Sequence, residues 1–255
     1  RVMKVLAITN QKGGVGKTTT AVNLAASLAA EGKRVLLIDM DPQGNATTGA
    51  GITKKEALPT VYQLLIGAAT LLEVCIKTDF DFDILPANRE LAGAEVEMIE
   101  LDQREYRLKK ALAQNHAEYD FVLIDCPPAL NMLTVNALVA ADSVLIPMQC
   151  EYYALEGLSD LVETLRKVRH HLNSRLEIEG LLRTMYNGQS TLTQQVSSEL
   201  ESHFGDKVYK TIIPRNVRLA EAPSYGKPVL AFDKNSKGAQ AYGALAQEIL
   251  ERVAQ

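Results

Sequence analysis

The chain contains no tryptophan, and aromatic residues make up only 5% of its 255 residues. Its three cysteines, Cys75, Cys126 and Cys150, lie far apart and form neither a C-x-x-C pair nor a Cys/His ligand pattern. We therefore expect free thiols, and neither a disulfide framework nor a zinc site. The sequence shows no signal peptide and no apolar run of about 18 residues, the length a membrane span needs. These absences favour a cytoplasmic protein with no membrane segment.

A strong charge of one sign is also missing, because 27 Lys and Arg face 31 Asp and Glu, a net charge of −4. The charge is unevenly spread: residues 166–237 carry 12 Lys and Arg against 7 Asp and Glu, a local charge of +5. That excess either marks one basic face of the protein or is a chance distribution of solvated side chains. The length and the 47% hydrophobic content allow a substantial core, and we expect residues 1–255 to form a single α/β domain.

The most informative segment is residues 9–20, which read TNQKGGVGKTTT. An apolar run at residues 5–8 precedes it and a helix-compatible segment follows, which is the order that a triphosphate-binding loop requires. In such a loop, backbone N–H groups and the positive end of the helix bind phosphate oxygens. Lys17 is expected to reach the β- and γ-phosphates of a nucleotide, and the Thr18 hydroxyl to bind Mg²⁺. The predicted nucleotide contacts in this loop are Lys12, Gly13, Gly14, Val15, Gly16, Lys17, Thr18 and Thr19.

The loop departs from the ordinary G-x-x-x-x-G-K-[ST] pattern, because Gln11 stands where the first glycine would be and Lys12 adds a second lysine. A further cation beside Lys17 and Mg²⁺ is superfluous within one subunit, but useful if Lys12 reaches the γ-phosphate held by a partner subunit. These residues resemble the deviant Walker A family, which includes the ParA/Soj partition ATPases, MinD, the nitrogenase iron protein and the arsenical pump ATPase. The resemblance implies that Lys12 acts on the nucleotide of the other subunit.

Carboxylates follow two further strand-like runs. Asp41 comes just after the run VLLID at residues 35–39, and Asp125 ends the run FVLID at residues 121–125. Ligands of open α/β sheets bind outside the carboxyl ends of the strands, so both acids should face the phosphate loop. We expect Asp125 to be the Walker B carboxylate that acts on Mg²⁺ through water. Asp41 is expected to bind the metal as well and to position or activate the attacking water. Asp39 is expected to support the metal shell or the loop.

Strand-like and helix-like segments alternate along the chain, which predicts an α/β fold: a mostly parallel twisted sheet with helices on both faces, as in P-loop NTPases. The expected strands are residues 4–9, 34–39, 82–86, 121–125, 143–148, 179–185 and 208–213, with a further candidate at 228–232. The expected helices are residues 18–31, 60–65, 91–115, 131–140, 155–172, 191–204 and 238–254, and residues 44–59 are expected to form a loop.

Longer segments narrow the resemblance to one branch of the family. The segments DMDPQGNAT, ANRELAGAE, DFVLIDCPPALNMLT, QCEYYALEG and IIPRNVRLAEAPSYGKPV are similar to chromosomal ParA/Soj proteins. The resemblance implies a weak Mg-ATPase whose ATP-bound subunits close into a sandwich homodimer. It also implies that the dimer binds double-stranded DNA of the nucleoid without sequence preference, and that a ParB-type protein stimulates hydrolysis and releases it. Pro214 and Asn216 match the adenine-side loop of the family.

A possible DNA-binding surface lies in the basic third of the chain. Arg218 matches a family position that contacts DNA, and Lys227 is a candidate neighbour, as are Lys234 and Lys237, although each lysine alone also fits an ordinary solvated charge. After residues 179–185 many relatives have an acidic–Gly–Arg turn whose arginine supports DNA binding, whereas this chain has Gln189. One fewer phosphate contact predicts weaker nonspecific DNA binding and a salt slope lower by roughly 0.9.

The main alternative is a MinD-like positioning ATPase that acts on a membrane or a protein scaffold. Membrane targeting would need a C-terminal amphipathic helix with a basic face, whereas residues 239–255 carry one cation, Arg252, on a polar face of Gln and Glu. An iron–sulfur ATPase would need a second cysteine at a suitable spacing from Cys126, which the sequence lacks. A metabolic P-loop ligase is disfavoured by the family resemblance.

Overall fold

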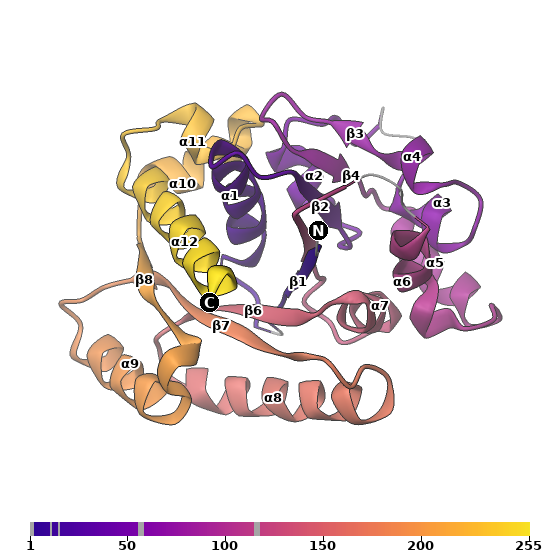
Figure 1. Ribbon diagram of the computed structural model, residues 1–255. Helices are drawn as coiled ribbons and strands as arrows, with labels where there is room; N and C mark the ends of the chain where they lie inside the picture. The colour runs from indigo at the N-terminus through magenta and orange to yellow at the C-terminus, as the bar shows by residue number, and fades with distance from the viewer. Residues whose placement is uncertain (1–2, 11, 15, 56–58, 115–117) are drawn as a thin grey trace.

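The computed structural model describes residues 3–10, 12–14, 16–55, 59–114 and 118–255. In these residues eight strands form one sheet in the order β3-β4-β2-β5-β1-β6-β7-β8, and every neighbouring pair except β3–β4 is parallel (Figure 1). The strands are β1 (Lys4–Ile8), β2 (Val35–Asp39), β3 (Ile76–Lys77), β4 (Asp83–Leu85), β5 (Phe121–Asp125), β6 (Ser143–Gln149), β7 (Glu177–Tyr186) and β8 (Val208–Pro214).

Helices cover both faces of this sheet, as predicted (Figure 1). Alternate residues of β2 explain the two layers: Leu36 and Ile38 enter one apolar core, while Val35 and Leu37 enter the other. On one face lie α3 (Val61–Leu65), α5 (Leu91–Met98), α6 (Arg107–Ala113), α7 (Met132–Ala140), α8 (Ala154–His171) and α9 (Thr191–Phe204). On the other lie α1 (Lys17–Ala30), α2 (Asn45–Gly49), α10 (Val217–Glu221), α11 (Val229–Phe232) and α12 (Lys237–Ala254). The remaining short helices are α4 (Leu71–Val74), η1 (Arg104–Tyr106), η2 (Gly205–Lys207) and η3 (Ala222–Tyr225).

The apolar face of α12 is occupied within the fold. Tyr242, Leu245 and Ile249 are buried among residues of α1 and the sheet, and the Tyr242 hydroxyl shares a 2.9 Å hydrogen bond with Thr20 of α1. The last helix therefore packs as a core helix. Across the described ranges, no helix has the length and apolar character that crossing a bilayer requires.

The expected strand at residues 228–232 is wrong, because this segment forms the short helix α11. Pro228 caps the helix with an extended backbone (φ −61°, ψ 152°). The next amide, that of Val229, donates a 2.8 Å hydrogen bond to Asn23 Oδ1 of α1, and the Phe232 ring stacks on Tyr225 at 5.0 Å. Contacts with other helices therefore override the strand propensity of this apolar run.

The continuous helix expected over residues 91–115 is also wrong, because α5 ends at Met98 and the chain turns before η1 and α6. Gln103 takes a left-handed conformation with φ 52°. Asn136 of α7 stabilises the break: its side-chain nitrogen donates to Arg104 O at 2.9 Å, and its oxygen accepts from Leu108 N at 3.1 Å. Residue 115 lies outside the described residues. The expected loop at 44–59 likewise contains the helix α2.

Candidate functional site

The phosphate loop lies at the centre of the sheet, because β1 pairs with both β5 and β6. It connects the carboxyl end of β1 to α1, which begins at Lys17. Gly14 and Gly16 have φ values of 74° and 78°, left-handed conformations that glycine adopts without steric strain. The first turn of α1 leaves the amides of Lys17, Thr18 and Thr19 without partners inside the helix, an arrangement that suits an anion. The predicted contact at Val15 and the departure at Gln11 lie outside the described residues.

Lys17, Thr18 and Asp125 meet at the carboxyl ends of β1 and β5. Lys17 Nζ lies 3.2 Å from Asp125 Oδ1, and Thr18 Oγ1 donates to Asp125 Oδ2 at 2.9 Å. Burial disfavours the charged lysine, but the carboxylates of Asp125 and Asp41 outweigh this effect and raise the pKa of Lys17. Burial also raises the pKa of Asp125, although the charge of Lys17 opposes that shift. The charged Lys17 side chain and the Thr18 hydroxyl thus both contact one buried carboxylate, that of Asp125.

The two acids after β2 have different surroundings. Asp39 accepts hydrogen bonds from the amide of Asp41 at 3.0 Å and from the amide and hydroxyl of Thr47 at 3.0 and 2.8 Å. It therefore supports the loop, one of its two expected roles. Asp41 is buried within electrostatic reach of Lys17 and Asp125, and its Oδ1 accepts from the amide of Gln43 at 3.0 Å. Burial, with the Asp125 charge next, raises the pKa of Asp39 to about 7.

The donor set suits a hard cation. Thr18, Asp41 and Asp125 offer hydroxyl and carboxylate oxygens, the ligand type that Mg²⁺ prefers, usually together with waters and nucleotide phosphates. Within the described ranges, no cluster of three or more His, Cys, Asp or Glu side chains has the geometry of a self-sufficient metal cage. The residues therefore fit a Mg²⁺ ion that arrives with a nucleotide and is shared with its phosphates.

A cavity of about 550 Å³ opens beside the phosphate loop, a volume typical of small-molecule sites. Pro214, the last residue of β8, and Asn216 line this cavity. Asn216 Oδ1 is buried and has no hydrogen-bond partner among the described residues, so the cavity presents an acceptor that awaits a donor. The other lining residues include Gly14, Gly16, Thr19, Thr184, Met185 and Tyr242.

Sequence reasoning missed several residues of this cavity. Met185, the penultimate residue of β7, has φ 48°, a left-handed conformation that is rare for a side chain of its size. Tyr242 lies 222 positions from Thr20, its hydrogen-bond partner, and in the sequence it reads only as one residue of an apolar helical stripe. No local pattern marks either residue, because the fold alone brings them to the loop.

Lys12 does not join the Lys17–Asp125 cluster in this subunit. Its ammonium group forms an ion pair with Glu151, which follows β6. Sequence reasoning did not predict this partner.

The predicted DNA-binding residues lie near α10. Arg218 forms ion pairs with Glu221 at 3.1 Å and Asp233 at 3.2 Å, while Lys227 is exposed. Lys234 and Lys237 are exposed as well. Gln189 is exposed in the turn before α9, where its amide donates to Asn187 Oδ1 at 3.2 Å.

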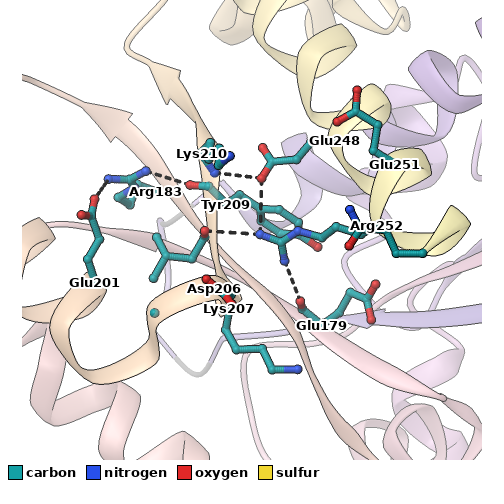
Figure 2. A pocket seen from close by; sticks show the side chains of 13 residues that line it. Glu179, Arg183, Glu201, Asp206, Lys207, Tyr209, Lys210, Glu248, Glu251 and Arg252 are labelled. Atoms are coloured by element: carbon teal, nitrogen blue, oxygen red, sulfur yellow. Dashed lines mark hydrogen bonds and ion pairs between the residues drawn. The ribbon is translucent and has the colours of Figure 1, made fainter.

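A larger hollow of about 890 Å³ lies at the amino ends of β7 and β8, away from the edge where parallel sheets bind ligands. Figure 2 shows that charged side chains there bind one another and the backbone: Arg183 binds Glu201, and Arg252 binds Glu248. We therefore assign the functional site to the smaller cavity beside the phosphate loop.

The chain is similar to several known proteins. A family model described as an AAA domain matches residues 3–178. The sporulation initiation inhibitor protein Soj of Bacillus subtilis is 56% identical over 247 residues, covering 96% of this chain and 98% of its own. The chromosome partitioning protein ParA of Caulobacter vibrioides is 53% identical over 253 residues, covering 98% and 95%. The solved structure of cobyrinic acid a,c-diamide synthase from Mycobacterium smegmatis, with an ATP analogue and magnesium bound, has a TM-score of 0.87 at 37% identity and covers 100% of this chain and 97% of that chain.

Proposed function

Because the chain belongs to the ParA/Soj family of chromosome-partitioning ATPases, we propose that it is an ATP-controlled switch that dimerises and binds DNA. The chain is an ATPase, and its cofactors are ATP and Mg²⁺. The observation that carries the proposal is the meeting of Lys17, Thr18 and Asp125 beside a cavity with an unpaired acceptor, Asn216 Oδ1, among the described residues. An adenine amino group is the donor that this acceptor suits.

We assign the chemical roles from these positions. Lys17 and the amides at the start of α1 hold the β- and γ-phosphates, and Thr18 and Asp125 hold Mg²⁺, the latter through water. Bound Mg²⁺ neutralises negative charge that builds up on the phosphates during transfer. Asp41 orients the attacking water. It is a buried carboxylate within electrostatic reach of Lys17 and Asp125, and its backbone is held by Asp39. Catalysis is then mostly positioning and charge stabilisation.

Lys12 completes the site from a second subunit in this proposal. Its half-exposed position outside the Lys17–Asp125 cluster supports a role beyond its own subunit. Lys17→Ala should abolish nucleotide binding, whereas Lys12→Ala should bind ATP normally and fail to dimerise. Calorimetric titration with ATP and sedimentation with ATP separate these two outcomes. ATP-dependent dimerisation of Lys12→Ala at the wild-type concentration would contradict the role in trans.

The dimer binds double-stranded DNA through the α10 region, and this interaction associates it with the nucleoid. Arg218 stands at this surface with exposed Lys227. The test is binding to random-sequence duplex DNA with ATP, ADP or no nucleotide over a salt series. Wild type should bind only with ATP and with a steep salt dependence, and Arg218→Glu should not bind although it still dimerises. Arg166→Glu is the matched control, because Arg166 is an exposed arginine with one Glu partner on α8, across the sheet.

A ParB-type partner should accelerate hydrolysis once the dimer is on DNA. One result would move the target elsewhere. Dimerisation with ATP but no DNA binding at any salt would favour a MinD-like role on a protein scaffold or membrane, although the apolar face of α12 is already packed. A ligase like the Mycobacterium diamide synthase is a weaker candidate, because that structure is 37% identical and ParA and Soj are 53% and 56% identical.

A further inference from the structure

The ion pair between Lys12 and Glu151 joins two segments at the carboxyl edge of the sheet. The Lys12 amide donates to Asn10 Oδ1 at 3.0 Å, and Asn10 Nδ2 donates to Pro147 O of β6 at 2.8 Å. The phosphate loop is thus tied to the strand that carries Glu151 just beyond its end. The two paired side chains are 46% and 38% exposed, so the pair lies at the surface of the protein, beside the phosphate loop.

The backbone on both sides fixes the position of Glu151. Its amide donates to Gln149 O at 3.0 Å, and its carbonyl accepts from Ala154 N at 3.1 Å. Tyr153, between Glu151 and the first residue of α8, has φ 64°, a conformation that non-glycine residues adopt only when their surroundings impose it. The turn therefore holds the backbone of Glu151 in place, and Lys12, which precedes Gly13 in the phosphate loop, pairs with its carboxylate.

We propose that Glu151 is a positioning residue for Lys12, which it holds within its own subunit until a second ATP-loaded copy of the chain offers a phosphate instead. This inference rests on the proposed function, because it requires an ATP-dependent dimer in which Lys12 serves the partner's nucleotide. A nucleotide phosphate carries more negative charge than one carboxylate. Enclosed between two subunits, it attracts Lys12 more strongly than a half-exposed glutamate that water screens. Closure of the dimer and release of Lys12 from Glu151 are then one event.

The size of the effect follows from the exposure of the pair. An ion pair this accessible changes an equilibrium by roughly 1.5- to 5-fold. A symmetric dimer has to open two such pairs, one in each subunit. The two factors multiply, so loss of the Glu151 charge should shift the dimerisation constant by roughly 2- to 25-fold. The direction is toward the dimer.

The first test measures dimerisation of the full chain by sedimentation velocity over a protein concentration series, with Mg²⁺ and the non-hydrolysable analogue AMPPNP. Glu151→Gln should dimerise at a concentration roughly 2- to 25-fold lower than wild type. Glu156→Gln, which removes one exposed charge in the first turn of α8, should match wild type. Unchanged or weakened dimerisation of Glu151→Gln, with wild type dimerising normally, would overturn the proposal.

The second test reports on the nucleotide-free subunit. Brief treatment with acetic anhydride, read by peptide mass spectrometry, gives the reactivity of Lys12 relative to Lys109, an exposed lysine of α6. Lys12 should react several-fold faster in Glu151→Gln than in wild type, with Lys109 unchanged, because pairing shields the Lys12 amine. Equal Lys12 reactivity in both proteins would overturn the proposal. If wild type does not dimerise with AMPPNP, the proposed function fails, while the acetylation still decides whether Glu151 holds Lys12.

Discussion

Gly180 of β7 is the position where one added methyl group should destabilise the fold most clearly. A Cβ atom at residue 180 would fall inside 3.0 Å of the Cζ and Cε2 atoms of the Tyr209 ring and 2.7 Å from its hydroxyl. The backbone of Gly180 does not require glycine, because its φ lies outside the left-handed region. The effect of Gly180→Ala is therefore a pure test of packing between β7 and the ring of Tyr209 on β8.

Neighbouring groups oppose movement of the ring. Tyr209 is fully buried, and the Arg252 guanidinium stacks over it with its Cζ 4.2 Å from the ring centroid. Arg252 in turn donates to Glu179 O at 3.1 Å and Val208 O at 3.3 Å. Figure 2 shows this arrangement at the start of β7 and β8. To restore ordinary contact distances the ring has to retreat by roughly 1 Å, and Arg252 has to shift with it.

The magnitude follows from these contacts. Overpacking of a well-packed core by one methyl costs about 1–3 kcal/mol, and each displaced hydrogen bond of Arg252 adds roughly 0.5–1.5 kcal/mol. We expect Gly180→Ala to lower the free energy of unfolding by about 3–5 kcal/mol, measured by urea denaturation followed by circular dichroism. The control is Gly243→Ala in α12, where the added methyl would meet no described atom within 4 Å. That change should raise the free energy of unfolding by about 0.5–1 kcal/mol.

A loss below about 0.5 kcal/mol for Gly180→Ala, the size of an ordinary surface substitution, would refute this reasoning. The double variant Gly180→Ala/Tyr209→Leu gives an independent check, since a smaller side chain at 209 removes the clash. Its free energy of unfolding should be close to that of Tyr209→Leu alone, so that the two changes are non-additive by more than about 1 kcal/mol. Additive effects would show that the ring is not the cause.

Three further predictions concern the site. Asp41→Ala should bind ATP and dimerise but release phosphate about 10²- to 10⁴-fold more slowly, because the attacking water loses its carboxylate; wild-type turnover would exclude this role. Burial raises the pKa of Asp39 to about 7, above the roughly 3.9 of the same residue in an unfolded chain. Between about pH 3.9 and 7 the folded protein therefore binds a proton on Asp39 that the unfolded chain does not bind. The free energy of unfolding falls as pH rises through this range. Relative to Asp39→Asn, which has no such proton, wild type should therefore lose roughly 2–3 kcal/mol between pH 5 and 7 in urea titrations without nucleotide or Mg²⁺; a pH-independent difference would show that the carboxyl is charged throughout. Gln189→Arg should tighten nonspecific DNA binding and steepen the salt slope by roughly 0.9, and an unchanged slope in a salt series would place residue 189 off the DNA.

The sequence was sufficient to predict those parts of the site that depend on residues close together in the chain. The phosphate loop, the helix after it and the carboxylate at each strand end all follow from local pattern, since parallel strands bring their carboxyl ends to one edge. Lys17 and Asp125 illustrate this: the loop pattern predicts the lysine and a strand end predicts the acid, and the two side chains meet although 108 positions separate them. The two-faced covering of the sheet also follows, because the continuous apolar runs of β2 and β5 require it.

The sequence was insufficient to predict local structure and contacts that depend on a side chain far away in the chain. Asn136 fixes the break near Arg104, and Asn23 holds the start of α11, through hydrogen bonds that span 32 and 206 positions. Glu151 lies 139 positions from Lys12, and an acid before a helix has no pattern that reveals such a partner. Helix and strand propensities are too small to outweigh these tertiary contacts.

The hydrogen bond between Thr20 and Tyr242 joins α1 and α12, two parts of the cavity that are synthesised at different times. The ribosome makes the phosphate loop well before the tyrosine that contacts its helix, because Tyr242 lies 222 positions after Thr20. At elongation rates of about 5–20 residues per second, that interval is roughly 10–45 s. An unfinished chain that stops before this tyrosine therefore carries the phosphate loop without the side of the cavity that Tyr242 forms.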